Sequence, residues 1–391
     1  METRHALIVG AGIGGPVLAL GLRRLGMRVT LVDRRGRAAD AEGAFLGLAP
    51  NGMHALAALD AAGPVARLGF PCSAFHFRSG SGRSLGVIDR SRDVERFGWP
   101  LTMVRRGELH RVLLEQAEAA GAGVQLERTF RTLEQRPGKG VVAHFEQGPS
   151  IEADMLFGCD GLRSRVRAAA FPGAPPPAFS GLWDYGGFAR IEGTPLRPGV
   201  NEMVFGKRAF FGAFLTPAGE VWWFHNGPEK LEGSPEAMID GLCRLHADDP
   251  PWICEVLRAT PEPLGPWGLY DLQGVRPWSN GRVCLLGDAA HAMSPSAGQG
   301  ASLAMEDALA LTLALRDNES PEAAFAAYER FRRDRVETIA RVARRNGSGK
   351  APGPIGRRIR DLVLPFFLRL GGRAQDRGYA WRFGWETRVS L

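Results

Sequence analysis

Cysteine is scarce and scattered in this chain, which has only five cysteines among 391 residues. They are Cys72, Cys159, Cys243, Cys254 and Cys284, and no two of them form a CxxC pair. The odd number and the wide spacing argue against a disulfide framework and against a structural zinc site. We therefore expect no bound metal and a reducing, cytoplasmic environment.

Long apolar runs are also missing from the sequence. No stretch of about 18 apolar residues occurs, so no transmembrane helix is expected. The first apolar run, Ala6–Val9, is too short for a signal peptide and leads directly into glycines. The H-E-x-x-H motif of zinc proteases and the G-x-S-x-G motif of serine hydrolases are absent as well. The sequence thus gives no support to metal-assisted or serine-dependent hydrolysis.

The composition, with 45% hydrophobic and 23% charged residues, is typical of a globular protein. A chain of this length predicts two domains, or one domain with a large second lobe. Much of the net charge of +7 lies between Arg330 and Arg360. We interpret these arginines as a solvated helix face paired with glutamates, since no nucleic-acid motif accompanies them. Peripheral contact with a membrane is the alternative interpretation; we expect a monomer or homodimer with a small organic substrate and no nucleic acid partner.

A glycine turn near the start of the chain carries the first functional signal. His5–Val9 has the pattern of a buried strand, and Gly10, Gly12, Gly14 and Gly15 follow it. Gly10 permits a tight turn, Gly12 lets the backbone approach a pyrophosphate, and Gly15 lets helix and strand pack closely. A helix over Pro16–Leu25 would present its positive N-terminus to the phosphates.

A second strand, Val29–Val32, completes a βαβ unit and ends at Asp33. An acid at this position accepts hydrogen bonds from a ribose diol in dinucleotide-binding proteins. The glycine turn and Asp33 together predict a bound dinucleotide, but they do not distinguish NAD from FAD.

Two later motifs make that distinction. The segment 159–167 reads CDGLRSRVR, and the segment 281–291 reads GRVCLLGDAAH, followed by Pro295 and by Gly298-Gln299-Gly300. With the glycine turn and with Arg106-Gly107-Glu108-Leu109, they resemble the group A flavoprotein monooxygenases of the p-hydroxybenzoate hydroxylase type. The segment 43–52, GAFLGLAPNG, resembles a loop that lies beside the flavin in that family. Phe45-Leu46 departs from the more frequent Gly-Ile, which puts flavin position or substrate access in question.

The resemblance implies an FAD site. Asp288 would bind the ribityl hydroxyls, Asp160 would support the pyrophosphate region while Arg167 holds its loop, and Arg106 would meet the ribityl or phosphate side. Pro295 and Gly298–Gly300 would line the isoalloxazine ring. The full set of expected cofactor-binding residues is Gly10, Gly12, Gly14, Gly15, Asp33, Arg34, Arg106, Asp160, Arg167, Asp288, Pro295, Gly298, Gln299, Gly300 and Ala301.

The substrate side is expected in the segment 187–226, whose alternating, aromatic-rich pattern predicts an antiparallel sheet. The candidate substrate residues are Phe205, Phe211, Phe214, Trp223, His225, Trp183 and Tyr185. His225 could orient or deprotonate a phenol. Pro295, Gly298 and His225 are therefore the candidate catalytic residues, and His291 is expected to be a neutral histidine bonded within its loop.

The resemblance implies an α/β fold: a Rossmann-type FAD-binding domain like that of p-hydroxybenzoate hydroxylase, an inserted, mainly antiparallel substrate domain, and a C-terminal helical segment. The expected FAD-binding domain comprises 1–70, 99–170 and 277–345. The substrate domain comprises 71–98 and 171–276, and the helical segment comprises 346–391.

The implied activity is that of an FAD-dependent monooxygenase. FAD would be held tightly but non-covalently, and transiently bound NADH or NADPH would reduce it. Oxygen would then add at flavin carbon 4a as a hydroperoxide. In a site that excludes water, an aromatic or polyketide-like molecule would be hydroxylated or epoxidised. A flavin-dependent dehydrogenase, reductase or halogenase and a non-catalytic flavin-binding, ligand-sequestering protein are the alternatives. The segment 222–226 lacks the W-x-W-x-I-P sequence of the halogenases.

Overall fold

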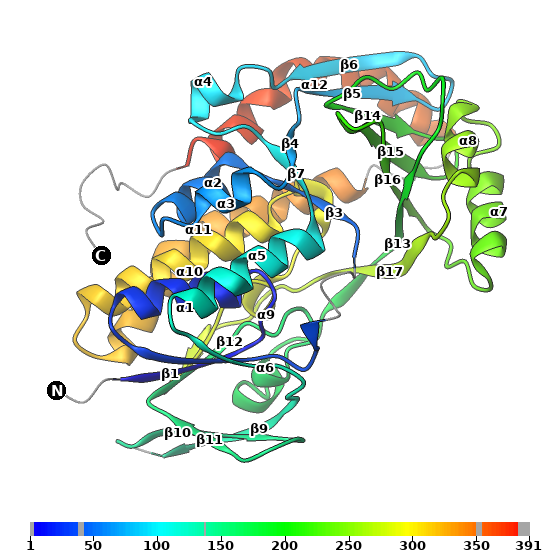
Figure 1. Cartoon of the computed structure of the whole chain (residues 1–391). Helices are drawn as coiled ribbons and strands as arrows, with labels where there is room; N and C mark the ends of the chain where they lie inside the picture. The colour runs from blue at the N-terminus through cyan, green and yellow to red at the C-terminus, as the bar shows by residue number, and fades with distance from the viewer. Residues whose placement is uncertain (1–3, 38–42, 137, 349–353, 382–391) are drawn as a thin grey trace.

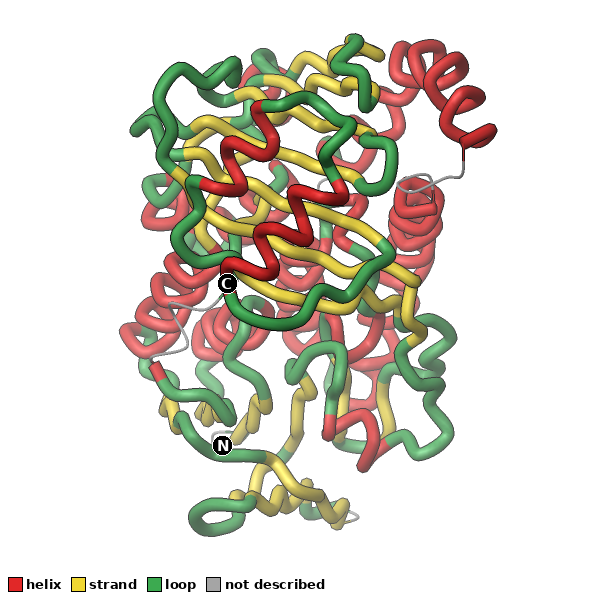
Figure 2. The backbone as a smooth tube through the Cα atoms, turned by 90° about the vertical axis from the view of Figure 1, so that its right-hand side faces the viewer, coloured by secondary structure: helices red, strands yellow, loops and turns green. Residues whose placement is uncertain are grey.

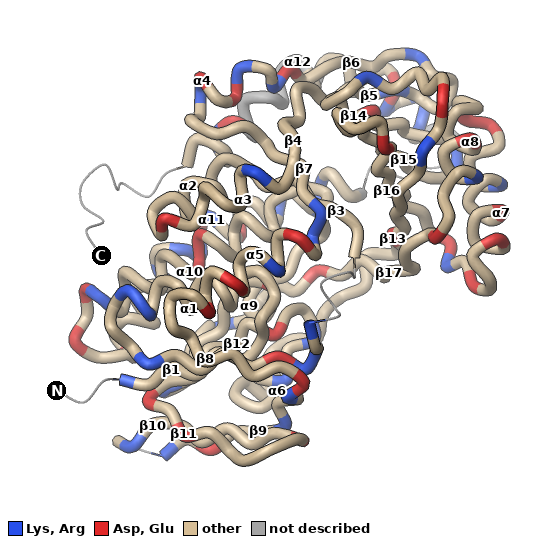
Figure 3. Tube along the Cα trace, in the orientation of Figure 1, with Lys and Arg blue, Asp and Glu red and all other residues tan. Residues whose placement is uncertain are grey.

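The computed structural model describes residues 4–37, 43–136, 138–348 and 354–381 (Figure 1). The predicted α/β fold is confirmed: a parallel sheet and a larger, mainly antiparallel sheet are joined by helices and by two small sheets. Acidic and basic residues are interspersed along the chain (Figure 3). Among the described residues, no helix is long and apolar enough to cross a membrane.

The first sheet has six strands, of which β18 alone runs antiparallel to its neighbour. In spatial order they are β18 (Ser279–Asn280), β19 (Val283–Leu285), β12 (Met155–Gly158), β1 (His5–Val9), β2 (Arg28–Val32) and β8 (Gly123–Gln125). β1, β12 and β19 are fully buried, which explains their apolar sequences. Their carboxyl ends lead into the three motifs, so the parallel pairing gathers at one edge of the sheet segments that lie far apart in the sequence.

Helices cover one side of this sheet and a small ribbon lies on the other (Figure 1). The covering helices are α1 (Gly14–Arg24), α5 (Arg106–Ala119), α10 (Gly300–Asp317) and α11 (Pro321–Ser348). The ribbon consists of β9 (Phe130–Arg136), β10 (Gly140–Phe145) and β11 (Ile151–Ala153), with α6 (Arg165–Ala170) beside it. This arrangement follows from the apolar parallel sheet, which requires cover on both faces.

The second sheet has seven strands. In spatial order they are β17 (Leu264–Asp271), β13 (Ala178–Ala189), β16 (Val221–Gly227), β15 (Phe210–Leu215), β14 (Val200–Phe205), β5 (Ala74–Ser79) and β6 (Ser84–Asp89). Strands from the segments 71–98 and 171–276 therefore join in one sheet, although the exact domain boundaries stay a prediction. Helices α7 (Pro235–Leu245) and α8 (Trp252–Arg258) lie across its outer face (Figure 2).

The inner face of the seven-stranded sheet meets a short sheet of β3 (Phe45–Leu48), β7 (Thr102–Arg105) and β4 (Phe70–Pro71). The segment 43–52, which the sequence suggested to be a loop, forms β3 and the start of α2 (Pro50–Ala57). β3 pairs with β7, and this fixes the side chain of Phe45 against the second sheet.

Small helices complete the structure: α3 (Ala62–Ala66), α4 (Asp93–Phe97), α9 (Asp288–His291) and the 3-10 turn η2 (Pro295–Ala297). The last helix, α12 (Pro354–Tyr379), packs against β6. It forms the predicted C-terminal helical segment from residue 354 to residue 379.

Candidate active site

The glycine turn joins β1 to α1 at very short range. Gly10 has φ +109°, and a Cβ there would lie 2.3 Å from the carbonyl oxygen of Cys159. A Cβ on Gly15 would lie 1.9 Å from the carbonyl oxygen of Gly10. Gly12 differs, since no atom lies within 4 Å of the position its Cβ would take. Gly10 and Gly15 therefore serve packing, while the backbone of Gly12 borders open space.

The N-terminus of α1 is open to an anionic ligand. Its capping residue, Ile13, makes no side-chain hydrogen bond to the helix, and the first turn contains no acidic residue. The free N–H groups and the helix dipole at such an end favour a phosphate. A diphosphate therefore fits here without displacing any side chain that already caps the helix.

Asp33 is 8% exposed and holds the glycine turn to the end of β2. One carboxylate oxygen accepts from the amide of Ala11 at 2.7 Å, and the other accepts from the amide of Arg35 at 2.9 Å. Arg34, next along the chain, is exposed. Asp33 thus has a local structural task, and the ribose contact stays a proposal.

Asp160 caps the helix that follows β12. Its carboxylate accepts from the hydroxyl of Ser164 and from the amides of Arg165 and Val166, the latter two at 2.7 and 3.1 Å. Ser164 in turn accepts from the amide of Arg167 at 2.8 Å. The DGxxSxxR spacing is therefore the spacing of a helix start, and the contact of Asp160 with a pyrophosphate stays a proposal.

Arg167 links the second motif to the third. Its buried guanidinium donates to the carbonyl of Leu162 at 2.6 Å and to that of Ala289 at 2.8 Å. Ala289 belongs to α9, the short helix that begins at Asp288. The loops after β12 and β19 are therefore held together by one side chain.

Asp288 is the first residue of α9, shortly after β19. Its side chain is exposed to solvent, yet desolvation by the surrounding protein raises its pKa, while His291 and Arg106 partly oppose this shift. A carboxylate that water reaches although protein atoms surround it can receive hydroxyl donors from a ligand. Arg106, at the start of α5, packs beside Gly43, whose Cβ would lie 3.4 Å from the arginine Cδ.

The start of α10 is a second open helix N-terminus. Gln299 caps the helix without a side-chain hydrogen bond to it, and no acidic residue stands in the first turn, which includes Ala301. A Cβ on Gly298 or on Gly300 would have no atom within 4 Å. Gly298 has φ +60° and directly follows the turn that contains Pro295. The backbone N–H groups here fit a ligand that gains negative charge, such as a reduced flavin.

A buried ion-pair network behind these loops was not predicted from the sequence. The amide nitrogen of Asn51 donates to Gln299 at 2.9 Å and to Glu306 at 2.7 Å. Glu306 is fully buried and pairs with Arg332 and Arg335, each at 2.6 Å. The network therefore reaches from α11 to the residue that caps α10.

Asp307 forms the second branch of this network. It accepts from Arg332 at 2.7 Å and from the amide of Gly287 at 3.2 Å, and it lies 2.7 Å from His291 Nε2. Although desolvation opposes the shift, His291 and Arg332 hold the pKa of Asp307 below its ordinary value. The expected bonding of His291 within its own loop is thereby corrected, because its partner is on α10.

The network also corrects the interpretation of the arginine-rich segment as a solvated face. Arg332 is 0% exposed, and Arg335 pairs with the same buried glutamate, so two of these arginines point into the protein. The available sequence signal was Glu306-Asp307, two adjacent acids inside an otherwise apolar helix. Such a pair needs buried cations as partners.

The inner face of the seven-stranded sheet forms an aromatic wall, which we define as Phe188, Phe205, Phe210, Phe214, Trp222 and Phe224. Two of the expected substrate residues, Phe205 and Phe214, belong to it. The ring of Phe45 lies between 5.4 and 6.5 Å from the rings of Phe188, Phe214, Trp222 and Phe224. Phe45, at the position where the sequence departs from the family that it resembles, therefore contacts the centre of the wall.

The other five expected substrate residues lie on the opposite face of the sheet. Tyr185, Phe211 and Trp223 are buried against α7 and α8, and Trp183 packs at the edge of the same cluster. The alternation of side chains along a strand causes this separation. We therefore withdraw these residues from the substrate set and assign them to the core between sheet and helices.

His225, the fifth of these residues, is fully buried on the same outer face. Its Nδ1 lies 2.9 Å from Nε2 of His246, whose Nδ1 lies 2.8 Å from the carboxylate of Asp249. Desolvation and the neighbouring His246 lower the pKa of His225. A role in deprotonating a phenol on the inner face does not agree with this placement.

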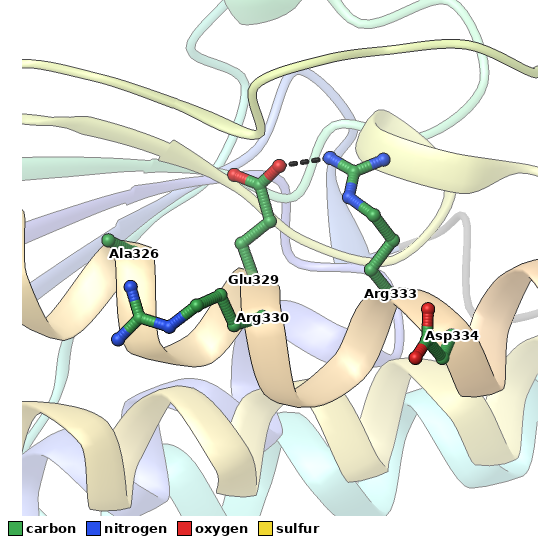
Figure 4. A pocket seen from close by; sticks show the side chains of 5 residues that line it. All are labelled: Ala326, Glu329, Arg330, Arg333 and Asp334. Atoms are coloured by element: carbon green, nitrogen blue, oxygen red, sulfur yellow. Dashed lines mark hydrogen bonds and ion pairs between the residues drawn. The ribbon is translucent and has the colours of Figure 1, made fainter.

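A depression on the surface of α11 is separate from all of these loops. It is lined by Ala326, Glu329, Arg330, Arg333 and Asp334, and Glu329 accepts a hydrogen bond from Arg333 (Figure 4). Since no residue of the three motifs contributes to its lining, we do not assign it to the active site.

Comparison with known proteins agrees with this geometry. A family model described as an FAD binding domain matches residues 3–188 and 247–345. A 3-amino-4-hydroxybenzoate 2-monooxygenase of Streptomyces platensis is 31% identical over an alignment 404 positions long, which covers 97% of this chain and 96% of that protein. A 3-hydroxybenzoate 6-hydroxylase of Klebsiella oxytoca is 28% identical, with 98% of each chain covered.

A solved structure is also similar over almost the whole chain. The Klebsiella pneumoniae protein HpxO, in complex with FAD and uric acid, has a TM-score of 0.85 and 25% identity, with 96% of each chain covered. The glycine turn, the two open helix N-termini and the exposed Asp288 all fit FAD as the cofactor. The chain therefore belongs to the group A FAD-dependent monooxygenases, the family of p-hydroxybenzoate hydroxylase, and is an FAD enzyme that incorporates one oxygen atom into its substrate.

Proposed function

We propose that this enzyme uses NADH or NADPH and dioxygen to hydroxylate or epoxidise a largely apolar aromatic molecule at the inner face of the seven-stranded sheet. The observation that carries the proposal is the contact of Phe45 with four rings of the aromatic wall. A wall of this composition binds an aromatic substrate by apolar burial and ring stacking.

The charges next to the wall favour a substrate without a carboxylate. The guanidinium carbon of Arg105 lies 3.8 Å from the centroid of the Phe188 ring, and the same guanidinium pairs with the carboxylate of Glu220 at 2.6 Å. The guanidinium carbon of Arg360 lies 4.7 Å from the centroid of the Phe205 ring, and the same guanidinium pairs with the carboxylate of Asp361 at 2.8 Å. Within the part of the chain that the structure describes, the two arginines that stack on the wall, Arg105 and Arg360, already have carboxylate partners. The relatives from Streptomyces platensis and Klebsiella oxytoca are both named for benzoates, which carry a carboxylate. We therefore propose that the substrate preference of this enzyme differs from the substrates in their names.

The cofactor loops would divide the remaining tasks. Bound FAD would accept hydride from the nicotinamide cofactor and supply activated oxygen from carbon 4a. The N–H groups at the starts of α1 and α10 would hold the diphosphate and the electron-rich edge of the flavin, respectively. Asp288 and Arg106 would bind the ribityl chain between them. The apolar rings of the wall would exclude water from the reacting atoms.

Turnover measurements with the FAD-loaded enzyme test this proposal. Neutral phenols of one to three fused rings and hydroxybenzoates of similar size would be added with NADH or NADPH under labelled dioxygen. We expect a neutral phenol to stimulate oxidation of the nicotinamide cofactor and to gain one labelled oxygen atom, with hydroxybenzoates less effective. Cofactor oxidation without an oxygenated product would instead favour a reductase, and FAD binding without turnover would favour a ligand-sequestering protein.

A further inference from the structure

Helix α12 carries an exposed apolar stripe. Ile359, Leu362, Val363 and Phe366 are 58%, 80%, 38% and 64% exposed. Their spacing of three, four and seven residues places them on one face of the helix. Leu362 is the most exposed of the large hydrophobic residues that the structure describes. Contiguous apolar patches that are exposed to solvent often mark sites that interact with another protein or with a membrane.

The opposite side of the same helix is firmly attached to the protein. Leu368 packs on β6 so closely that a Cβ on Gly86 would lie 2.9 Å from its Cδ1. Near the end of the helix, Asp376 pairs with Arg90 at 2.8 Å, and Tyr379 is buried. The helix therefore has its own core-facing side, and the stripe faces outward because of that attachment.

Basic residues border the stripe. Arg358 is exposed next to Ile359, and Arg83 is exposed on the neighbouring β5–β6 turn, from which it donates to the carbonyl of Asp361 at 3.2 Å. Lys207 and Arg208 are exposed on the β14–β15 turn, where both pair with Asp248, and the carbonyl of Lys207 accepts a hydrogen bond from Arg357. The whole chain also has a net charge of +7.

We propose that this face of α12 binds an anionic phospholipid surface. The helix would lie in the plane of the interface, with the four apolar side chains in the headgroup region and the bordering arginines next to lipid phosphates. A second copy of the chain is a poorer occupant, because stable protein interfaces bury about 20–30 residues on each partner. Figure 1 shows α12, β6 and α4 together at one end of the molecule, where a flat surface can reach them.

Vesicle sedimentation of the FAD-loaded full chain tests the proposal without any assay of turnover. The vesicles would be phosphatidylcholine alone or phosphatidylcholine with one third phosphatidylglycerol. We expect at least tenfold tighter binding to the anionic vesicles. The double substitution Leu362→Ser, Phe366→Ser should weaken this binding about tenfold or more, because it removes apolar area from the lipid contact. Arg358→Glu should weaken it about fivefold or more and leaves the apolar stripe intact.

Trp267→Ser is the matched control, because Trp267 is 38% exposed on β17, at the opposite edge of the sheet from β6. It should bind vesicles like the unchanged protein. Equal binding to both vesicle types, or unchanged binding of Arg358→Glu, would overturn the proposal even if the double variant failed to fold. A lipid-free dimer that the double substitution dissociates, seen by sedimentation velocity, would also overturn it and would assign the stripe to a homodimer interface.

Discussion

The ring of Phe45 lies 5.4 Å from the ring of Trp222, centroid to centroid. The first residue belongs to the strand that follows the glycine-turn unit, and the second belongs to the centre of the seven-stranded sheet. Their contact packs β3 against the aromatic wall, and it is made by a side chain at the position where the family resemblance predicts glycine. Substrate access in this enzyme is therefore expected to depend on Phe45.

Replacing Phe45 with glycine should widen the range of substrates and reduce coupling. The space of one ring would admit bulkier aromatic molecules, while water would enter and divert activated oxygen to hydrogen peroxide. The free energy of unfolding should fall by about 2 kcal/mol, less than for a fully buried phenylalanine. The ratio of product to NADH or NADPH consumed, measured over substrates of increasing size, checks this expectation. Phe45→Leu keeps most of the apolar volume and should preserve coupling; an unchanged ratio in Phe45→Gly would show that the ring does not control access.

Replacing Asp288 with alanine should weaken FAD binding by about tenfold to a hundredfold, the usual loss for hydrogen bonds to a charged group. The exposed carboxylate has no structural hydrogen-bond task comparable to that of Asp33, so the fold should persist. Recovery of FAD fluorescence on dilution measures the affinity. Asp317→Ala, at the exposed far end of α10, is the control and should keep its flavin. A fully yellow Asp288→Ala protein with unchanged affinity would remove Asp288 from the site.

The elements around the cofactor could be predicted from the sequence because their signals are local. β1 has the predicted bounds and β2 begins one residue before its predicted start, since each is a short apolar run that ends at the glycine turn or at Asp33. The start of α11 follows from a capping serine and a proline at the first turn. These signals need no knowledge of what the element packs against.

The side of the second sheet that faces the cofactor could not be predicted. Alternation along β15 separates Phe211 from Phe214 but does not reveal which of them points inward. That choice depends on β3 packing against the sheet from far away in the sequence, as the contact between Phe45 and Phe214, 169 positions apart, illustrates. The network of Asn51, Glu306 and Arg332 escaped prediction for the same reason, because its partners belong to three separate segments.

Replacing Asp307 with asparagine should destabilise the protein and loosen the cofactor loops together. The change leaves Arg332 with an incomplete set of buried partners, and breaking a buried pair costs about 3–5 kcal/mol. Because Asp307 also holds Gly287 and His291, the FAD affinity should fall, and the reduction potential of any retained flavin should shift. Chemical denaturation and spectroelectrochemistry measure the two effects. Glu337→Gln, which removes a half-exposed partner of Arg333, should change neither by a comparable amount; equal effects of both substitutions would argue against a special role for the buried network.

Acidification below pH 6.5 should destabilise the protein partly through His225. Burial and the nearby His246 lower the pKa of His225 in the folded state, whereas the unfolded chain binds a proton near the ordinary value of 6.5. Below that pH the unfolded state holds more protons at this site, so stability falls as the pH decreases, by up to about 1.4 kcal/mol per pH unit for this one site. His5, whose pKa is also lowered by burial, should contribute in the same direction. Denaturation at pH 7.5 and pH 5.5 measures the loss, and His225→Gln should reduce it. The same loss in the variant would assign the acid sensitivity to other groups. His225 and its partners His246 and Asp249 lie on the side of the sheet that faces α7 and α8, away from the cofactor loops.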